Sequence, residues 1–206
     1  PAQPQPVPRP QAPAAPVKAM VAEVTAQLGP VDALINNAGI GILKPFAELS
    51  LAEWDQSMAT NLRSLFLVTR EVLPGMRSRG RGAIVNIASL AGKNAVVGGT
   101  AYAASKHAVA GLTKSAAWEC TGTGVRVNCV CPGLIDTEMG RQENAAHEEG
   151  FAAMARMSAI DRRGVAEDIA RAALFFVADA PYVTGQVLAP PRLDDRLRHP
   201  GRHAAG

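Results

Sequence analysis

The chain has 206 residues, of which 48% are hydrophobic and 19% are charged, and its formal net charge is +3. This length and balance predict one folded domain with a substantial core and argue against global disorder. Aromatic residues make up only 4% of the chain, without a basic stripe among them, and no apolar run approaches the roughly 18 residues of a membrane span, so nucleic-acid binding and membrane insertion have little support.

The first 16 residues are rich in proline, alanine and glutamine. Proline fixes φ and removes an amide donor, so we expect residues 1–16 to form a disordered or polyproline-like arm, with a ligand for a proline-recognising domain as the alternative. Residues 190–206 are rich in proline, arginine, histidine and glycine, and we expect a disordered tail there. The folded domain is therefore expected over residues 17–189.

Helical and extended patterns alternate between the two tails. Helices are expected over Val17–Leu28, Leu51–Met76, Tyr102–Trp118 and Ala166–Ala178. Strands are expected over Val31–Ile35, Ala83–Ala88, Val125–Cys131 and Tyr182–Ala189. Ser50 and Glu53 have the spacing of a capping box at the start of the second helix. Such alternation predicts an α/β fold with a parallel sheet and helices on both faces.

The stretch from Ala83 to Lys106 carries the candidate chemistry. Ser89 follows a predicted buried strand, and Tyr102 and Lys106 lie four residues apart, so a helix places them one turn from each other. An ammonium group near a phenol favours the phenolate and lowers the phenol's pKa, which suits proton transfer. The alternative is structural: Tyr102 packs against a neighbour, Lys106 is solvated and Ser89 merely ends a strand.

This stretch resembles the active site of the short-chain dehydrogenase/reductases, and the chain is similar to the 3-oxoacyl-carrier-protein reductases among them. The resemblance implies a Rossmann-like, doubly wound parallel sheet and an NAD- or NADP-dependent interconversion of a ketone and a secondary alcohol by hydride transfer. It makes Tyr102 the general acid and base, and Lys106 the group that lowers its pKa and holds the nicotinamide ribose. Ser89 would position the substrate oxygen, and Asn61 would support the proton relay.

The same resemblance implies two further contacts with the cofactor. The turn after the first predicted strand would lie beside the ribose and nicotinamide, through Asn37, Ala38 and Gly39. The segment after the third predicted strand would close over the nicotinamide, and its contacting residues would be Pro132, Gly133, Ile135 and Thr137. The region 140–160 would cover the substrate, and it does not reveal which substrate that is.

The resemblance begins at about Val17, and the Gly-rich turn that seats the cofactor pyrophosphate has no counterpart before Asn37. We therefore expect a truncated fold in which the strand Val31–Ile35 is an exposed apolar edge. The alternative function is a catalytically inactive remnant that serves as an oligomerisation or interaction module. If the chain folds, the resemblance implies a homodimer or homotetramer that acts on a small molecule.

Three cysteines, Cys120, Cys129 and Cys131, have neither the spacing of a zinc site nor that of a disulfide scaffold. We expect buried free thiols and no bound metal. With no signal-peptide pattern at the N-terminus, this usage predicts a cytoplasmic protein.

Overall fold

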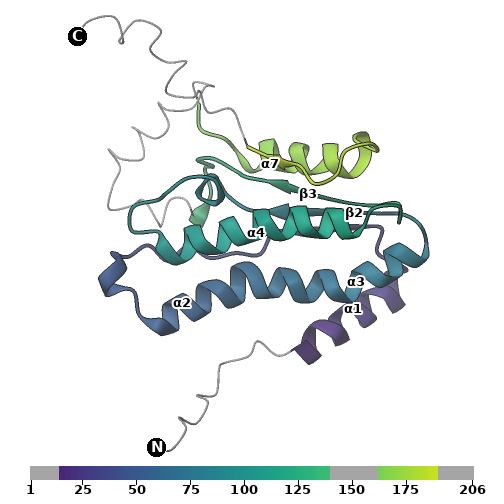
Figure 1. Ribbon diagram of the computed structural model, residues 1–206, viewed down its shortest axis with the longest axis horizontal. Coiled ribbons are helices and arrows are strands. Elements are labelled where there is room, and N and C mark those ends of the chain that lie inside the picture. Colours follow the sequence, from purple (N-terminus) through teal and green to yellow (C-terminus); the bar gives the residue numbers. More distant parts are fainter. Residues whose placement is uncertain (1–13, 140–161, 190–206) are drawn as a thin grey trace, which may run out of the picture.

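The computed structural model describes residues 14–139 and 162–189 (Figure 1). Four parallel strands form one sheet in the order β1 (Ala33–Asn36), β2 (Gly82–Ile87), β3 (Val125–Val130) and β4 (Val187–Leu188). Helices cover both faces of this sheet, so the expected Rossmann-like α/β class is confirmed. The proline-rich arm up to residue 13, the substrate-covering region 140–160 and the tail 190–206 lie outside the described residues.

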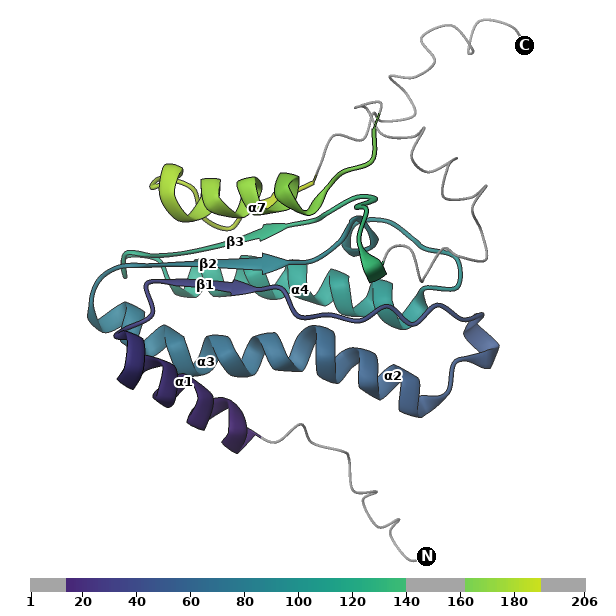
Figure 2. The same ribbon diagram turned by 180° about the vertical axis from the view of Figure 1, so that it is seen from behind.

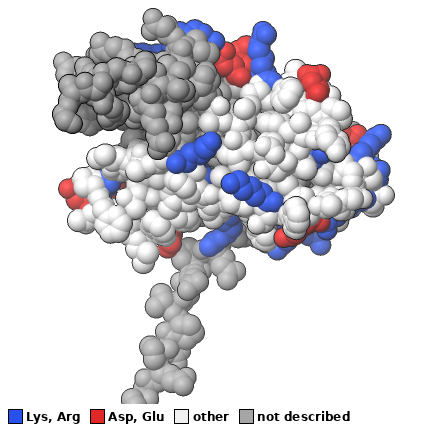
Figure 3. All heavy atoms as spheres, turned by 45° about the horizontal axis from the view of Figure 1, so that its top comes forward, with Lys and Arg blue, Asp and Glu red and all other residues white. Residues whose placement is uncertain are grey.

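In the described part of the chain, helices lie on both faces of the sheet (Figures 1 and 2). One face carries α1 (Ala14–Leu28), α2 (Leu51–Met58), α3 (Ser64–Ser78) and α4 (Thr100–Glu119), and the opposite face carries α7 (Ala166–Leu174). No helix in the described part of the chain is long and apolar enough to cross a bilayer. On the face shown in Figure 3, the Lys and Arg side chains lie in separate groups among uncharged atoms.

The register brings the carboxyl ends of three strands to one edge of the sheet. Asn36 of β1 lies opposite Asn86 of β2, and Ile87 lies opposite Val130 of β3. Because all strands run parallel, the loops that follow them leave the sheet on the same side, where ligands bind in open α/β sheets. The residues that we expect to form the active site follow β1, β2 and β3 at these carboxyl ends.

Side chains alternate between the two faces of each strand and build a core on each face. Ile84 and Val127 pack with Val72 and Met76 of α3 on one face, and none of these four is more than 6% exposed. On the other face, a second cluster packs around Phe176, just after α7. Its buried members are Val85, Ile87, Val130, Ala173, Phe176 and Ala180.

A buried chain of amides and hydroxyls joins β1 and β2 to the helices beneath them. The Asn36 amide donates to Asn86 Oδ1 at 2.8 Å and to Thr69 Oγ1 of α3 at 3.1 Å. Asn86 in turn donates to Thr113 Oγ1 of α4 at 2.9 Å. Buried polar groups are costly unless they are hydrogen-bonded, and these are satisfied, so the network fixes how the two helices lie against the sheet.

The boundaries of several elements differ from the sequence predictions. Helix α1 begins at Ala14, inside the predicted arm, and Pro16 lies in its first turn, where a missing amide donor is tolerated. The last strand is only Val187–Leu188, and a five-residue π-helical segment follows α7. The periodicity of a sequence shows which positions are apolar. It does not show the hydrogen bonds with which a helix or strand ends, and these bonds define the boundaries of the element.

The predicted helix Leu51–Met76 is interrupted. Helix α2 (Leu51–Met58) begins with the expected capping box between Ser50 and Glu53, and both of its hydrogen bonds are present. Ala59–Arg63 then forms a π-helical turn before α3. A π turn widens the helix locally and is often found at functional sites.

Two glycines before β3 share a positive φ but differ in their surroundings. Gly122 and Gly124 both have φ of 75°, and a Cβ at Gly122 would meet nothing within 4 Å. A Cβ at Gly124 would lie 1.9 Å from the carbonyl oxygen of Gly80, in the turn before β2. The backbone of that turn therefore leaves no room for a side chain at Gly124.

Alanine substitutions at Gly122 and Gly124 distinguish the cost of a positive φ from the cost of a steric clash with a neighbouring backbone. We expect Gly122→Ala to cost about 1 kcal/mol, the penalty for an L-residue at positive φ. Gly124→Ala should cost roughly 3 kcal/mol or more, because the turns must also move apart. Urea unfolding of both variants measures the difference, and equal costs would show that the Gly80–Gly124 contact is not tight.

Candidate active site

The ammonium group of Lys106 lies buried at the carboxyl end of β2. Lys106 is on α4 and only 4% exposed, and its Nζ donates to the carbonyl oxygen of Ile87 at 3.1 Å. The same Nζ lies 5.7 Å from the centre of the Tyr102 ring, one helical turn earlier. A cation this close to an aromatic ring is attracted to its face, and the attraction grows when the phenol ionises.

Ser89 lies two residues beyond Ile87, where β2 has ended. Its hydroxyl oxygen accepts from the amide of Ala91 at 3.1 Å and so begins a short 3₁₀ turn, Leu90–Gly92. That turn packs directly on α4, since a Cβ at Gly92 would lie 2.7 Å from the carbonyl oxygen of Lys106. Glycine is required here by the close approach of two backbones, and this approach holds the Ser89 loop beside the Lys106 helix.

Asn61, in the π-helical turn, ties the loop after β1 to α4. It is 2% exposed, accepts from the amide of Ile40 at 2.8 Å and donates to the carbonyl oxygen of Ile40 at 3.0 Å. Its amide also donates to Ser105 Oγ at 3.0 Å, and Ser105 donates to the carbonyl oxygen of Tyr102 at 2.7 Å. Asn61 is therefore connected to the backbone of Tyr102 through one buried hydroxyl.

The turn after β1 reaches the same place. A Cβ at Gly39 would lie 3.2 Å from Lys106 Nζ and 3.4 Å from Asn61 Oδ1, so this glycine sits between the ammonium and the amide. Asn37 and Ala38, just before it, are exposed. The small residues of the turn leave its backbone directly beside the Lys106 head group.

The segment after β3 borders the site from the other side. Pro132 accepts from the amide of Leu90 at 2.8 Å and so holds the Ser89 loop. Further on, Ile135 pairs with Gly164 in an isolated parallel bridge, through a bond from Asp136 N to Gly164 O at 2.9 Å. The loop that contains Pro132, Gly133, Ile135 and Thr137 is thus anchored near both of its ends.

Two thiols lie beneath this loop and perturb each other. The neighbouring Cys129 thiol lowers the pKa of Cys131 to about 7, helped by the Ser89 amide and by the charges of Lys93 and Lys106. The neighbouring Cys131 thiol, together with burial, raises the pKa of Cys129, whose own thiol donates to the carbonyl oxygen of Val130 at 3.6 Å. Of the two thiols, Cys131 is therefore the more acidic.

The structure brings Gly39, Asn61, Tyr102 and Lys106 together and places Ser89 at the neighbouring strand end. Their catalytic and cofactor-binding roles remain predictions. Sequence reasoning missed Ser105, although a serine three residues after Tyr102 can donate back to its carbonyl within a helix. It also missed Ile40, which is hydrogen-bonded to Asn61, and Gly92, which packs on the backbone of Lys106, because both contacts join distant segments of the chain.

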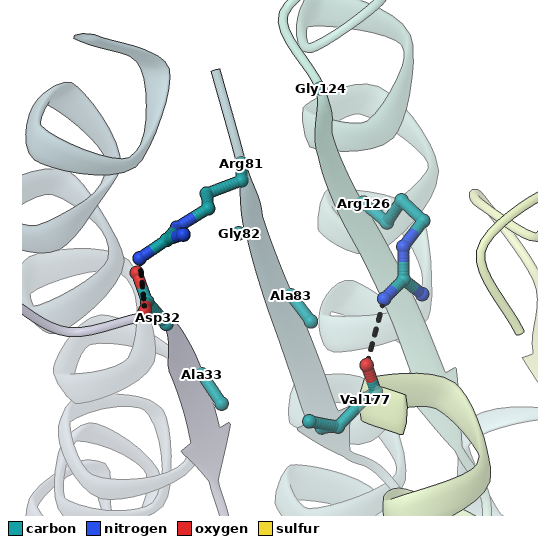
Figure 4. Close-up of a pocket in the computed structure, with 8 residues that line it drawn as sticks. All are labelled: Asp32, Ala33, Arg81, Gly82, Ala83, Gly124, Arg126 and Val177. Carbon is teal, nitrogen blue, oxygen red and sulfur yellow. Dashed lines mark hydrogen bonds and ion pairs between the residues drawn. The ribbon is translucent and has the colours of Figure 1, made fainter. Parts of the chain in front are cut away.

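A hollow of about 380 Å³ lies at the opposite, amino-terminal ends of the strands (Figure 4). Its lining residues are Asp32, Ala33, Arg81, Gly82, Ala83, Gly124, Arg126 and Val177. Arg81 pairs with Asp32 at 3.0 Å, and Arg126 donates to carbonyl oxygens near the end of α7. The charged groups here stabilise turns, and the hollow is remote from the Lys106 head group.

No group of three His, Cys, Asp or Glu side chains in residues 14–139 and 162–189 is placed to hold a metal ion.

A sequence model of the short chain dehydrogenase family matches residues 12–148. The chain belongs to this family. Its relatives include nodulation protein G of Azospirillum brasilense, which is 44% identical over 83% of this chain and 69% of that protein. Acetoacetyl-CoA reductase of Rhizobium meliloti is 38% identical over 82% of this chain and 70% of that enzyme.

Another relative in the family is named as inactive: inactive 2-(S)-hydroxypropyl-CoM dehydrogenase 2 of Xanthobacter autotrophicus, 41% identical over 84% of this chain and 77% of that protein. Among solved structures, ElxO with NADP bound superposes with a TM-score of 0.80 at 29% identity, over 86% of this chain and 73% of that one. A tyrosine-to-phenylalanine variant of ElxO with NADPH bound superposes with a TM-score of 0.79.

Replacing Asn61 by alanine tests whether its amide holds the site together. Asn61→Ala removes the bonds to Ile40 and Ser105 and leaves part-buried polar groups unsatisfied, so we expect a loss of about 2–4 kcal/mol in the free energy of unfolding. The exposed Asn94 provides the control, and Asn94→Ala should change stability by less than about 0.5 kcal/mol. Equal effects of the two substitutions in urea unfolding would contradict the connecting role of Asn61.

Proposed function

We propose that this chain is an NAD(P)-dependent oxidoreductase that interconverts a ketone and a secondary alcohol. The observation that carries the proposal is the buried Lys106 ammonium, 5.7 Å from the Tyr102 ring at the carboxyl edge of the sheet. The family membership and the NADP-bound ElxO structures support it. The cofactor, when bound, exchanges a hydride with the carbon of the substrate.

Tyr102 is proposed to move the proton. A phenol has an ordinary pKa of about 10 and is a poor acid or base at neutral pH. The ammonium of Lys106 is buried, so its charge is screened less than in water, and we propose that it lowers the pKa of that phenol. Tyr102 then gives its proton to the substrate oxygen in reduction and takes it back in oxidation.

Ser89 is proposed to hold the substrate oxygen beside Tyr102. Its position at the end of β2 is fixed by the hydrogen bond from the amide of Leu90 to the carbonyl oxygen of Pro132 and by the packing of Gly92 against α4. Asn61 is proposed to support the proton relay, because its amide is joined through Ser105 to the helical turn that carries Tyr102. Such hydrogen bonds hold the reacting oxygen and the phenol in a fixed relative position.

The residues around Lys106 fit the nicotinamide end of the cofactor. Gly39 leaves the backbone of its turn open beside the ammonium, and the exposed Asn37 and Ala38 adjoin it. We assign these three residues, with Tyr102 and Lys106, to the ribose side. The nicotinamide side is assigned to the segment after β3, through Pro132, Gly133, Ile135 and Thr137. Nothing in these residues chooses between NAD and NADP.

The substrate class is proposed from the relatives. Acetoacetyl-CoA reductase and three proteins named as ketoacyl reductases, two of them of polyketide synthases, are 38% to 48% identical to this chain over the aligned parts. A β-keto ester or thioester is therefore the first substrate to test, in the direction of reduction.

A second candidate is an inactive protein that works by oligomerising. Phe66 on α3 and Trp118 on α4 are 47% and 83% exposed, which is unusual for side chains of this size. Helices that expose large apolar side chains can pair with a second copy. This candidate predicts a stable dimer or tetramer in sedimentation without binding of NADH or NADPH.

Turnover of Tyr102→Phe tests the first candidate. Removing only the hydroxyl should lower the rate of acetoacetyl-CoA reduction at least a hundredfold and leave NADPH affinity within a few-fold, because the ring and Lys106 remain. The second tyrosine of the chain, Tyr182, is fully exposed, and Tyr182→Phe should leave the rate unchanged.

Two results would contradict the catalytic proposal. One is a Tyr102→Phe variant that keeps a tenth or more of the wild-type rate. The other is wild-type protein that binds neither NADH nor NADPH in a fluorescence titration up to millimolar concentrations, a result that would favour the oligomerising protein instead.

A further inference from the structure

The hydroxyl of Ser105 is fully buried and takes no direct part in the proposed transfer of a proton or a hydride. Ser105 lies on α4 and is 0% exposed. Its Oγ donates to the carbonyl oxygen of Tyr102 at 2.7 Å, a bond within one helical turn that already satisfies a buried serine hydroxyl. The same Oγ also accepts from the Asn61 amide at 3.0 Å, across 44 residues of the chain. This second bond joins α4 to the π-helical turn Ala59–Arg63.

The direction of these hydrogen bonds fixes the orientation of the Asn61 amide. A carbonyl oxygen only accepts, so the single proton of the Ser105 hydroxyl points to Tyr102, and Ser105 offers Asn61 only its lone pairs. Asn61 therefore turns its NH2 group toward Ser105 and uses the other proton of that group for the carbonyl oxygen of Ile40. The amide oxygen accepts from the Ile40 N–H at 2.8 Å. Turning the amide over would break all three bonds.

These bonds form part of a closed ring of contacts around the side chain of Lys106, the residue after Ser105. A Cβ at Gly39 would lie 3.2 Å from Lys106 Nζ and 3.4 Å from the amide oxygen of Asn61. Gly39 leads into Ile40, which Asn61 holds through both of its backbone groups. The bond from Asn61 to Ser105 returns to α4 and closes the ring. The Ser105 hydroxyl therefore helps to set how closely the turn after β1 approaches the ammonium.

We propose that Ser105 is a positioning residue, which acts through Asn61 to hold the turn after β1 against the Lys106 ammonium. Because its side chain is enclosed, Ser105 affects the site only through its neighbours. Without its hydroxyl, one N–H of the Asn61 amide loses its acceptor, and the turn can move away from α4. Water then reaches the ammonium and screens its charge, so the ammonium acts less strongly on the phenol of Tyr102. The consequence for catalysis rests on the proposed function, whereas the position of the turn does not.

The test compares two side chains of the same shape at position 105. Ser105→Thr and Ser105→Val both add one methyl group, but only Ser105→Thr keeps the hydroxyl. Hydrogen exchange of the Ile40 amide measures the result, because this amide donates to Asn61. We expect exchange to be about fivefold faster than in the wild-type protein for Ser105→Val and to stay within about twofold of it for Ser105→Thr.

Ser105→Ala provides a second comparison if the two larger side chains prevent folding at this buried position. It should also speed Ile40 exchange about fivefold, and Ser115→Ala, at an exposed serine of the same helix, should leave the exchange unchanged. Combining Ser105→Ala with Asn61→Ala should give no faster exchange than Asn61→Ala alone, because Ser105 acts on Ile40 through Asn61.

The phenol of Tyr102 tests whether the position of the turn matters to the ammonium. Its pKa, measured by NMR of ¹³C-labelled tyrosine, should rise by at least about half a unit in Ser105→Ala and Ser105→Val and stay unchanged in Ser105→Thr. Lys106→Met, which removes the cation, gives the largest rise that this loss can produce.

The proposal fails on any of three results. One is Ile40 exchange at the wild-type rate in Ser105→Ala and Ser105→Val, and another is a further increase in the double variant over Asn61→Ala. The third is a Tyr102 pKa that rises in Lys106→Met but not in Ser105→Ala. A pKa that rises in none of these variants contradicts the acid–base role given to Tyr102, and the exchange rates of Ile40 alone then decide the role of Ser105. None of the measurements requires cofactor binding or turnover.

Discussion

The arrangement depends on one buried cation. Lys106 is 4% exposed, and a buried ammonium is costly unless oxygen atoms or other polar partners replace its water. The carbonyl oxygen of Ile87, the last residue of β2, supplies one such partner at 3.1 Å. The end of β2 and the first turns of α4 thus fix the position of the Lys106 ammonium. The Tyr102 ring, one helical turn away, lies beside it.

Close backbone approaches support this position. Gly92 allows the Ser89 loop to touch the backbone of α4 at Lys106, and Gly39 allows the turn after β1 to touch its ammonium. Asn61 fastens the same turn by bonding both the amide and the carbonyl of Ile40. Segments that are far apart in the sequence therefore meet at Lys106 because small residues and one amide side chain bring their backbones together. A larger side chain at Gly92 would meet the backbone of Lys106, and one at Gly39 would meet its ammonium.

The sequence predicts the parts that depend on local chemistry. The capping box of Ser50 and Glu53 and the pairing of Tyr102 with Lys106 on one helical face follow from spacing alone, and the structure contains both. The two bonds of Asn61 to Ile40 span 21 residues, and no local pattern encodes them. The short β4 and the π turns depend equally on tertiary packing. The three cysteines are buried free thiols, as their spacing predicts.

The most direct test of the account is the pKa of the Tyr102 phenol, measured by NMR of ¹³C-labelled tyrosine. The chain has only two tyrosines, and the fully exposed Tyr182 serves as the internal reference. The account predicts that the pKa of Tyr102 lies at least about one unit below that of Tyr182, and that Lys106→Met removes the difference. A pKa of Tyr102 equal to or above that of Tyr182 in the wild-type protein would contradict it.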